Sequence, residues 1–141
     1  MYAFILFAIG LGVCSGASKI GEKVKLTNED VESDDFEEVN RVANVQCNLL
    51  SNSQYWFTQK YFYLGTKEVF YYGIRYDYSF VQVETNCLIT QVAAGGTTDI
   101  GTCGFHDDER TQRCNVTAIP QPNSPERLIT VTVTEVGTEE Y

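Results

Sequence analysis

The chain has 141 residues, enough for one domain with a modest hydrophobic core. It carries 19 acidic and 10 basic residues, so its formal net charge at pH 7 is -9. A chain this acidic lacks the basic surface with which proteins bind nucleic acids or anionic membranes. We therefore expect protein partners and neither nucleic acid nor a membrane. We also expect the protein to be a monomer.

The first seventeen residues are apolar and end in small side chains. This pattern is typical of a secretory signal peptide, with an apolar run from Tyr2 to Val13 and cleavage near Ala17. A membrane anchor is the alternative, but the run is shorter than the ~20 apolar residues that a spanning helix needs. No basic residue precedes the run, which departs from the usual signal pattern. We expect a signal peptide over residues 1–17 and a secreted, extracellular protein.

Four cysteines follow the signal peptide, namely Cys47, Cys87, Cys103 and Cys114. In an oxidising compartment they allow two disulfides with three alternative pairings, and the residues alone leave the pairing open. The triplet Asn115-Val116-Thr117 is a sequon for N-glycosylation in the same compartment. Asn115 is therefore a candidate glycosylation site.

One amphipathic helix is predicted near the start of the mature chain. Residues 18–34 are polar and acidic, and we expect them to form a flexible segment. From about Asp35 to Leu50 the apolar residues recur at helical spacing, and the turn-forming Ser51-Asn52-Ser53 follows. The apolar positions are Phe36, Val39, Val42, Ala43, Cys47 and Leu50.

The rest of the chain has the character of β-structure. Aromatic and β-branched residues predict strands over 55–64, 67–72, 74–85, 114–119 and 128–136, while the glycine- and threonine-rich stretch 90–104 is mostly loop. In the third strand, alternation places Ile74, Tyr76, Tyr78 and Phe80 on one face. This order predicts an α+β domain over residues 35–141, in which one helix covers an antiparallel sheet of four to five strands.

No group of residues predicts catalysis. The single histidine, His106, has only Asp107 and Asp108 beside it, and adjacent loop residues rarely converge on one metal ion. The nearby thiol of Cys103 is expected in a disulfide, where its sulfur cannot act as a nucleophile. Glycine-rich phosphate loops and Gly-x-Ser-x-Gly turns are absent from the sequence. We expect neither an enzyme nor a cofactor or metal site.

An aromatic turn is predicted at Gly73, which separates Val69-Phe70-Tyr71-Tyr72 from the alternating strand. Exposed there, the three rings would form a recognition surface of large contact area. Alternatively, they pack as ordinary core. The residues leave both interpretations open.

Several stretches resemble the secreted (type 2) cystatins. They are Cys103-Gly104-Phe105-His106 followed by Cys114, Ser51-Asn52-Ser53 after a single helix, the spacing from Gly73 to Cys87, and Pro120 near the last predicted hairpin. The resemblance runs from Gly21 to Val136 and lies in order and spacing more than in identity. It implies a curved antiparallel sheet around one helix. It also implies a wedge that blocks the active-site cleft of papain-like cysteine proteases without a covalent bond.

The resemblance assigns the wedge to three segments. They are Gly21, a first hairpin at Val69, Phe70, Tyr71, Tyr72 and Gly73, and a second hairpin at Pro120 and Gln121. The first keeps only the final glycine of the family's Gln-x-Val-x-Gly, and Gln121 stands where the family has tryptophan. Loss of such an anchor costs about 2 kcal/mol, or roughly thirtyfold in affinity. We expect weak or retargeted inhibition. The alternative is a non-inhibitory module that binds another protein through the aromatic hairpin.

The resemblance also implies roles for the cysteines and for Asn52. It pairs Cys87 with Cys103. The family's second bridge uses a C-terminal cysteine that this chain lacks. Cys47 and Cys114 therefore have two possible states. They pair if the predicted helix packs on the strand that begins at Cys114, or they remain free or intermolecular thiols. Asn52 matches the residue through which some family members block legumain-type proteases, and an ordinary turn residue is the alternative.

A second string, Gln91-Val92-Ala93-Ala94-Gly95, is spelled like the family's first hairpin. It follows Cys87 and would lie inside the loop that a Cys87–Cys103 bridge closes. Gly95 precedes Cys103 by only eight positions, which leaves no room for a long second strand. We expect the string to be a coincidence and residues 69–73 to hold the hairpin position.

Overall fold

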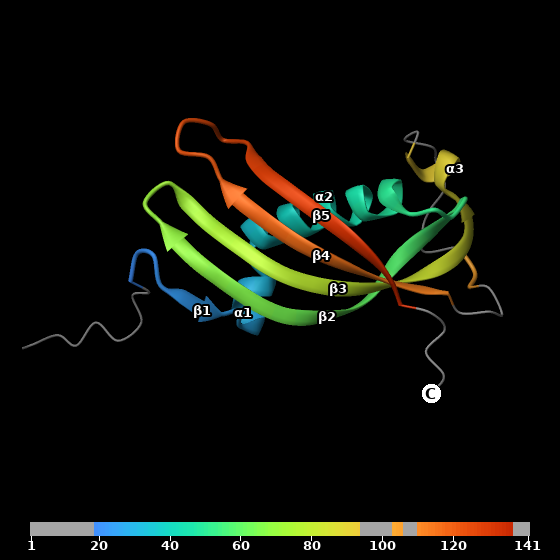
Figure 1. Cartoon of the computed structure of the whole chain (residues 1–141), viewed down its shortest axis with the longest axis horizontal. Helices are drawn as coiled ribbons and strands as arrows, with labels where there is room; N and C mark the ends of the chain where they lie inside the picture. Colours follow the sequence, from blue (N-terminus) through green and yellow to red (C-terminus); the bar gives the residue numbers. More distant parts are fainter. Residues whose placement is uncertain (1–18, 94–102, 106–109, 137–141) are drawn as a thin grey trace, which may run out of the picture.

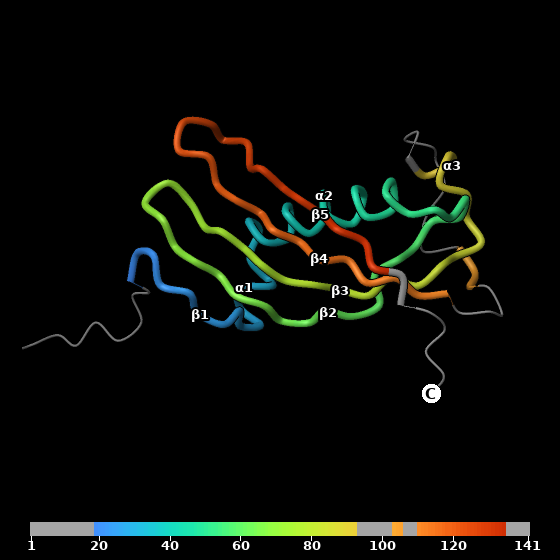
Figure 2. The backbone as a smooth tube through the Cα atoms, in the orientation of Figure 1, coloured from blue at the N-terminus to red at the C-terminus, as the bar shows by residue number. Residues whose placement is uncertain are grey.

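The computed structural model of the chain describes residues 19–93, 103–105 and 110–136 (Figure 1). In chain order its elements are β1 (Lys23–Lys25), α1 (Asn28–Val31), α2 (Asp34–Leu50), β2 (Tyr55–Phe70), β3 (Gly73–Leu88), α3 (Ile89–Ala93), β4 (Thr111–Pro120) and β5 (Arg127–Val136). The strands form one antiparallel sheet in the order β1-β2-β3-β4-β5. The sheet is long and curved, and α2 lies along one of its faces (Figure 2). The predicted α+β architecture is confirmed.

The long helix α2 forms where the apolar spacing predicts it. Ser33 caps its start by accepting the Phe36 N–H at 3.2 Å, and acidic residues of the first turn face the positive end of the helix dipole. The side chains that it buries against the sheet are Phe36, Val39, Ala43, Cys47 and Asn48. Leu50, expected in the core, is 57% exposed instead. The buried Asn48 faces the start of β2, and a residue two positions later points about 200° away around the helix.

The predicted break between two strands at Gly65 is wrong, because β2 continues through it as one strand. Tyr63 pairs with Ser79 and Thr66 with Asp77, so Leu64 and Gly65 together stand opposite Tyr78. This extra residue is a β-bulge, and glycine is common where a bulge brings two backbones together. Gly65 therefore bends the strand without ending it.

The segment 18–34, expected to be flexible, instead contributes β1 and α1 to the fold. β1 pairs with the end of β2 through Lys23 and Glu68. Thr27 and Asp30 form a reciprocal capping box at the start of α1, and the Asp30 carboxylate also accepts from Lys67 of β2. Burial opposes the charge on Asp30, but hydrogen bonds from Lys67 and Thr27 outweigh it and hold its pKa below the usual value. Lys67 and Glu68 are distant in the sequence, so the composition of residues 18–34 gives no sign of these contacts.

A buried disulfide joins α2 to β4. Cys47 and Cys114 are paired, with their Cα atoms 6.2 Å apart and both side chains fully buried. The structure therefore has the pairing expected if the helix packs on that strand. Cys87 and Cys103 form the second bridge, with Cα atoms 5.6 Å apart, as the resemblance implies.

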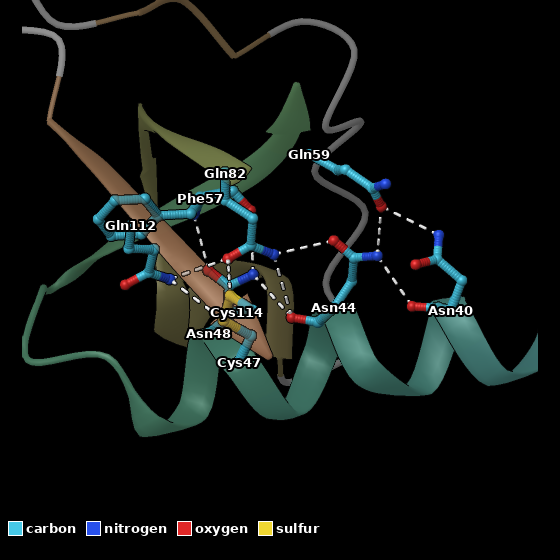
Figure 3. Close-up of a disulfide and its surroundings, with 9 residues drawn as sticks. All are labelled: Asn40, Asn44, Cys47, Asn48, Phe57, Gln59, Gln82, Gln112 and Cys114. Carbon is cyan, nitrogen blue, oxygen red and sulfur yellow. Dashed lines mark hydrogen bonds between the residues drawn. A yellow bond between two sulfur atoms is a disulfide. The ribbon is translucent and has the colours of Figure 1, made fainter. Parts of the chain in front are cut away.

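Amide side chains surround the buried disulfide and connect the helix to the sheet (Figure 3). Gln112 Nε2 donates to Gln82 Oε1 at 2.8 Å, and Gln82 Nε2 donates to Asn44 Oδ1 at 2.9 Å. Asn48 accepts the Phe57 N–H at 2.7 Å and donates to the Phe57 carbonyl at 3.0 Å. Its side-chain amide thus bonds both backbone groups of Phe57, as the backbone of a neighbouring strand would. Buried amides are stable only when partnered in this way. The network therefore fixes how α2 sits on β2, β3 and β4.

Candidate functional site

Three segments that are far apart in the sequence meet at one end of the sheet (Figure 1). They are residues 20–21 before β1, residues 69–73 at the turn from β2 to β3, and residues 120–127 at the turn from β4 to β5. We call this surface the hairpin end. The Gly21 N–H donates to the Val69 carbonyl at 2.9 Å, which joins the first two segments. A Cβ placed on Gly73 would lie 2.7 Å from the Pro120 Cβ, so the two turns are in direct contact.

The first turn depends on its glycine for two separate reasons. Phe70 and Gly73 pair across the hairpin, leaving Tyr71 and Tyr72 at the tip. Gly73 has a φ of +148°, which residues with side chains rarely adopt. Its neighbour Pro120 also leaves no room for a Cβ. Backbone conformation and the second turn together require glycine at this position.

The three aromatic rings of the first turn form a surface cluster. The Phe70 and Tyr72 rings stack with centroids 5.5 Å apart and an interplanar angle of 13°. Tyr71 meets Tyr72 edge to face, with centroids 4.8 Å apart. Phe70 and Tyr72 are half-buried, whereas Tyr71 is 84% exposed. Of the two interpretations that the sequence leaves open, the structure shows the exposed aromatic turn.

The second turn is held at its base by an ion pair with the start of α2. Pro120 is buried against Gly73, Gln121 is half-buried, and residues 122–126 are exposed. Beyond them, Arg127 lies 2.7 Å from the Asp35 carboxylate, and its guanidinium carbon lies 5.5 Å from the Tyr76 ring centroid. The Tyr76 hydroxyl donates to the same carboxylate at 2.8 Å. Burial and this hydrogen bond raise the pKa of Tyr76, so the hydroxyl stays protonated as a donor.

Two residues of the hairpin end, Ile20 and Arg127, were not predicted from the sequence. Ile20 is 69% exposed and directly precedes Gly21, so it presents an apolar side chain beside the first turn. A lone apolar residue in a polar stretch is the only sign of it in the sequence. Arg127 has no local sign at all, because its partner Asp35 lies 92 positions earlier.

Asn52 lies in the exposed turn between α2 and β2, which is at the other end of the sheet from the hairpin end (Figure 1). Two side-chain hydrogen bonds hold the backbone of this turn. The Ser53 N–H donates to Ser51 Oγ at 3.1 Å, and Ser53 Oγ donates to the buried carboxylate of Glu84 at 2.6 Å. The turn therefore presents the Asn52 side chain to solvent on a fixed backbone.

The described part of the string that matches the family hairpin, residues 91–93, also lies at this far end. Gln91 and Val92 belong to the short helix α3, whose first residue, Ile89, donates its N–H to the Gln54 carbonyl at 2.9 Å. Ala94 and Gly95 lie outside the described residues. Gln91 and Val92 are thus no part of the hairpin end, in keeping with the prediction that the string is a coincidence.

The remaining candidates fall elsewhere. His106, Asp107 and Asp108 lie outside the described residues. Within the described ranges, three or more His, Cys, Asp or Glu residues do not converge on a point that could hold a metal ion. Among the same residues, none of the helices is long and apolar enough to cross a membrane. Asn115 is exposed in the middle of β4, away from the hairpin end.

Comparisons with known proteins identify the fold. A scan against protein-family models finds no match, and a search of curated protein sequences finds none. Solved structures do match. Dimeric human cystatin F superposes with a TM-score of 0.61 at 12% identity, covering 87% of this chain and 94% of that one. Al-CPI superposes with a TM-score of 0.61 at 17% identity, covering 82% and 100%. Identities this low establish architecture alone, and the chain has a cystatin-like α+β fold.

Proposed function

We propose that the protein is a secreted inhibitor of papain-like cysteine proteases, and that its hairpin end enters the active-site cleft. One observation carries this proposal. The three segments assigned to the wedge from the resemblance lie side by side at one end of the sheet, and Tyr71 is the most exposed aromatic side chain among the described residues. The similarity in fold to cystatin F supports the same function.

The contacts within the hairpin end suit non-covalent blocking of a cleft. The contact of Gly73 with Pro120 and the pairing of Arg127 with Asp35 hold the two turns before binding. A surface that is already ordered loses little conformational entropy when it binds. Tyr71 adds a large apolar area with few rotatable bonds, which is the usual character of an energetic hot spot. Such binding would compete with substrate and would leave the catalytic cysteine unmodified.

Aromatic area is distributed differently here than the family pattern implies. The second turn has Gln121 in place of tryptophan, while the first turn has Tyr71 in place of valine, flanked by Phe70 and Tyr72. The first turn therefore supplies the aromatic anchor in this chain. We expect its shape to change which protease is bound, or how tightly.

Tyr71→Ala is expected to weaken inhibition by roughly thirtyfold, the equivalent of about 2 kcal/mol for a hot-spot aromatic residue. The free energy of unfolding should hardly change, because the Tyr71 side chain is 84% exposed. The measurement is a titration of the mature protein and the variant against papain and a cathepsin. Phe105→Ala is the matched control, since Phe105 is an exposed aromatic residue (58%) outside the hairpin end.

Failure to inhibit either enzyme at roughly tens of micromolar would contradict the proposal, since it corresponds to less than about 7 kcal/mol of binding free energy. That result would favour the second candidate function, a non-inhibitory module. The exposed aromatic cluster of Phe70, Tyr71 and Tyr72 favours this candidate, because it can serve as a binding surface for another protein.

We also propose Asn52 as a separate contact for legumain-type, Asn-specific proteases. The fixed and exposed turn that presents its side chain supports this role. Asn52→Ala should abolish inhibition of legumain, with a loss of at least about a hundredfold, because the pocket of such an enzyme would lose its hydrogen-bonding partner. Inhibition of papain should be unchanged, since the α2–β2 turn with Asn52 and the β2–β3 turn with Tyr71 lie at opposite ends of the sheet (Figure 1). Gln54→Ala, an exposed amide of the same turn, is the control. Equal legumain inhibition by all three proteins would contradict this role.

A further inference from the structure

Asn115 occupies an open position on the outer face of the sheet. The chain contains a single Asn-x-Ser/Thr triplet, Asn115-Val116-Thr117. In β4 the neighbours Cys114 and Val116 are buried toward α2, whereas Asn115 between them is exposed. Successive side chains of a strand point to opposite faces, so Asn115 points away from the helix. Its side-chain amide is directed to solvent rather than into the core.

The residues around Asn115 leave space on one side. It pairs across the sheet with Ser79 of β3 and Thr132 of β5. On the β3 side, Arg113 donates to Ser79 Oγ at 3.0 Å and stacks over Tyr63 at 4.5 Å from the ring centroid. On the β5 side, the three outward-facing residues nearest Asn115 are small, hydroxylated and exposed, namely Thr130, Thr132 and Thr134. A large polar group on Asn115 would therefore extend over β5.

We propose that Asn115 carries an N-linked glycan that covers the outer face of β4 and β5. The co-reactant is a lipid-linked oligosaccharide of the secretory pathway. The Asn115 Nδ2 bonds to the anomeric carbon of the sugar and loses one proton, and the lipid pyrophosphate leaves with the electron pair of the broken C–O bond. Two disulfides are consistent with passage through that compartment. This proposal does not rest on protease inhibition.

The position of the glycan leaves the hairpin end accessible. Pro120 lies five positions after Asn115 along the extended strand, a distance of about 17 Å. β5 is the last strand of the sheet, and its outer edge has no strand partner within the described residues. A bulky hydrophilic group over β5 would discourage pairing with another chain at that edge. The glycan would thus protect the sheet without obstructing the candidate binding surface.

The full chain, expressed in eukaryotic cells and collected from the medium, tests the proposal. We expect a mass increase of one N-glycan, its removal by peptide N-glycosidase, and its location in the peptide containing Asn115. Asn115→Gln and Thr117→Val should lose the mass increase, whereas the matched control Thr117→Ser should keep it. Three results would each overturn the proposal. They are a secreted wild-type chain with the mass of the bare polypeptide, a chain retained inside the cell with unmodified Asn115, and a glycan that persists in Asn115→Gln.

Papain binding distinguishes this proposal from the proposed function. Glycosylated and enzymatically deglycosylated protein should inhibit equally if the glycan lies over β5. An unmodified chain that inhibits papain would overturn the glycan alone, and a glycosylated chain that does not inhibit would overturn the inhibitor function alone. Stronger inhibition after deglycosylation would overturn the placement of the glycan away from the hairpin end.

Discussion

Replacing Cys47 and Cys114 together by alanine is expected to lower the free energy of unfolding by about 4 kcal/mol. The bridge joins residues 67 positions apart, so its loss restores a large conformational entropy to the unfolded chain. It also removes two fully buried sulfur atoms from the contact between α2 and β4. A domain of this size has only about 5–15 kcal/mol of stability in total, so the variant should be close to unfolding at 37 °C.

The measurement is urea unfolding of the wild-type chain and the double variant without reductant. Cys87→Ala with Cys103→Ala is the matched control, since that bridge closes only 16 positions and should contribute about 3 kcal/mol. Cys87 and Cys103 are also only half-buried, so little packing is lost with them. A Cys47/Cys114 variant within about 1 kcal/mol of wild type would show that the amide network alone holds α2 on the sheet.

The sequence was sufficient to predict those parts of the fold that follow from periodicity. Helical spacing placed α2 to within one residue at its start, and alternation placed Tyr76, Tyr78 and Phe80 in the core. Both patterns depend on one face of an element being buried, which is a local property of the chain. They therefore predicted the elements, and the resemblance added their arrangement.

Periodicity could not predict the polar contacts that fix the arrangement. Asn48 is fully buried because it bonds the backbone of Phe57, and Gln82 because it lies between Asn44 and Gln112. An asparagine or glutamine in such a pattern would ordinarily be assigned to the surface. Only the pairing of distant elements makes its burial favourable. For the same reason, β1 and α1 were mistaken for a flexible segment.

At the candidate site, position in the fold is more informative than identity to a sequence motif. Gln91 and Val92 match the sequence of a known hairpin motif but lie in α3. Residues 69–73 keep only the final glycine of that motif, Gly73, yet they form the turn. The turn was predicted from Gly73 itself, which stands between two predicted strands and can supply the positive φ of a tight turn. The exposure of Tyr71 and the approach of Pro120 could not be predicted, because both depend on the packing of two hairpins.

Gly65→Ala is the second large effect that we expect, a loss of about 3 kcal/mol in the free energy of unfolding. A Cβ on Gly65 would overlap the Asp77 carbonyl oxygen, and it would lie 2.8 Å from the Tyr78 Cα. Both atoms belong to the backbone of β3, so a change of rotamer cannot relieve the overlap. The strands must instead separate at the bulge, which costs ladder hydrogen bonds on either side.

The strain from Gly65→Ala should also reach the hairpin end. The Gly65 carbonyl accepts the Leu26 N–H at 2.9 Å, directly after β1, and β1 leads back to Gly21 beside the first turn. Displacing the bulge would therefore loosen the N-terminal segment, and inhibition of papain should weaken in the protein that remains folded. Gly104→Ala is the control, because the nearest atom to its new Cβ is the Asn86 side-chain nitrogen at 3.0 Å, which can move. Comparable urea midpoints for the two variants would show that the β2–β3 ladder tolerates a side chain at the bulge, and that the close approach of Gly65 to Asp77 does not govern stability.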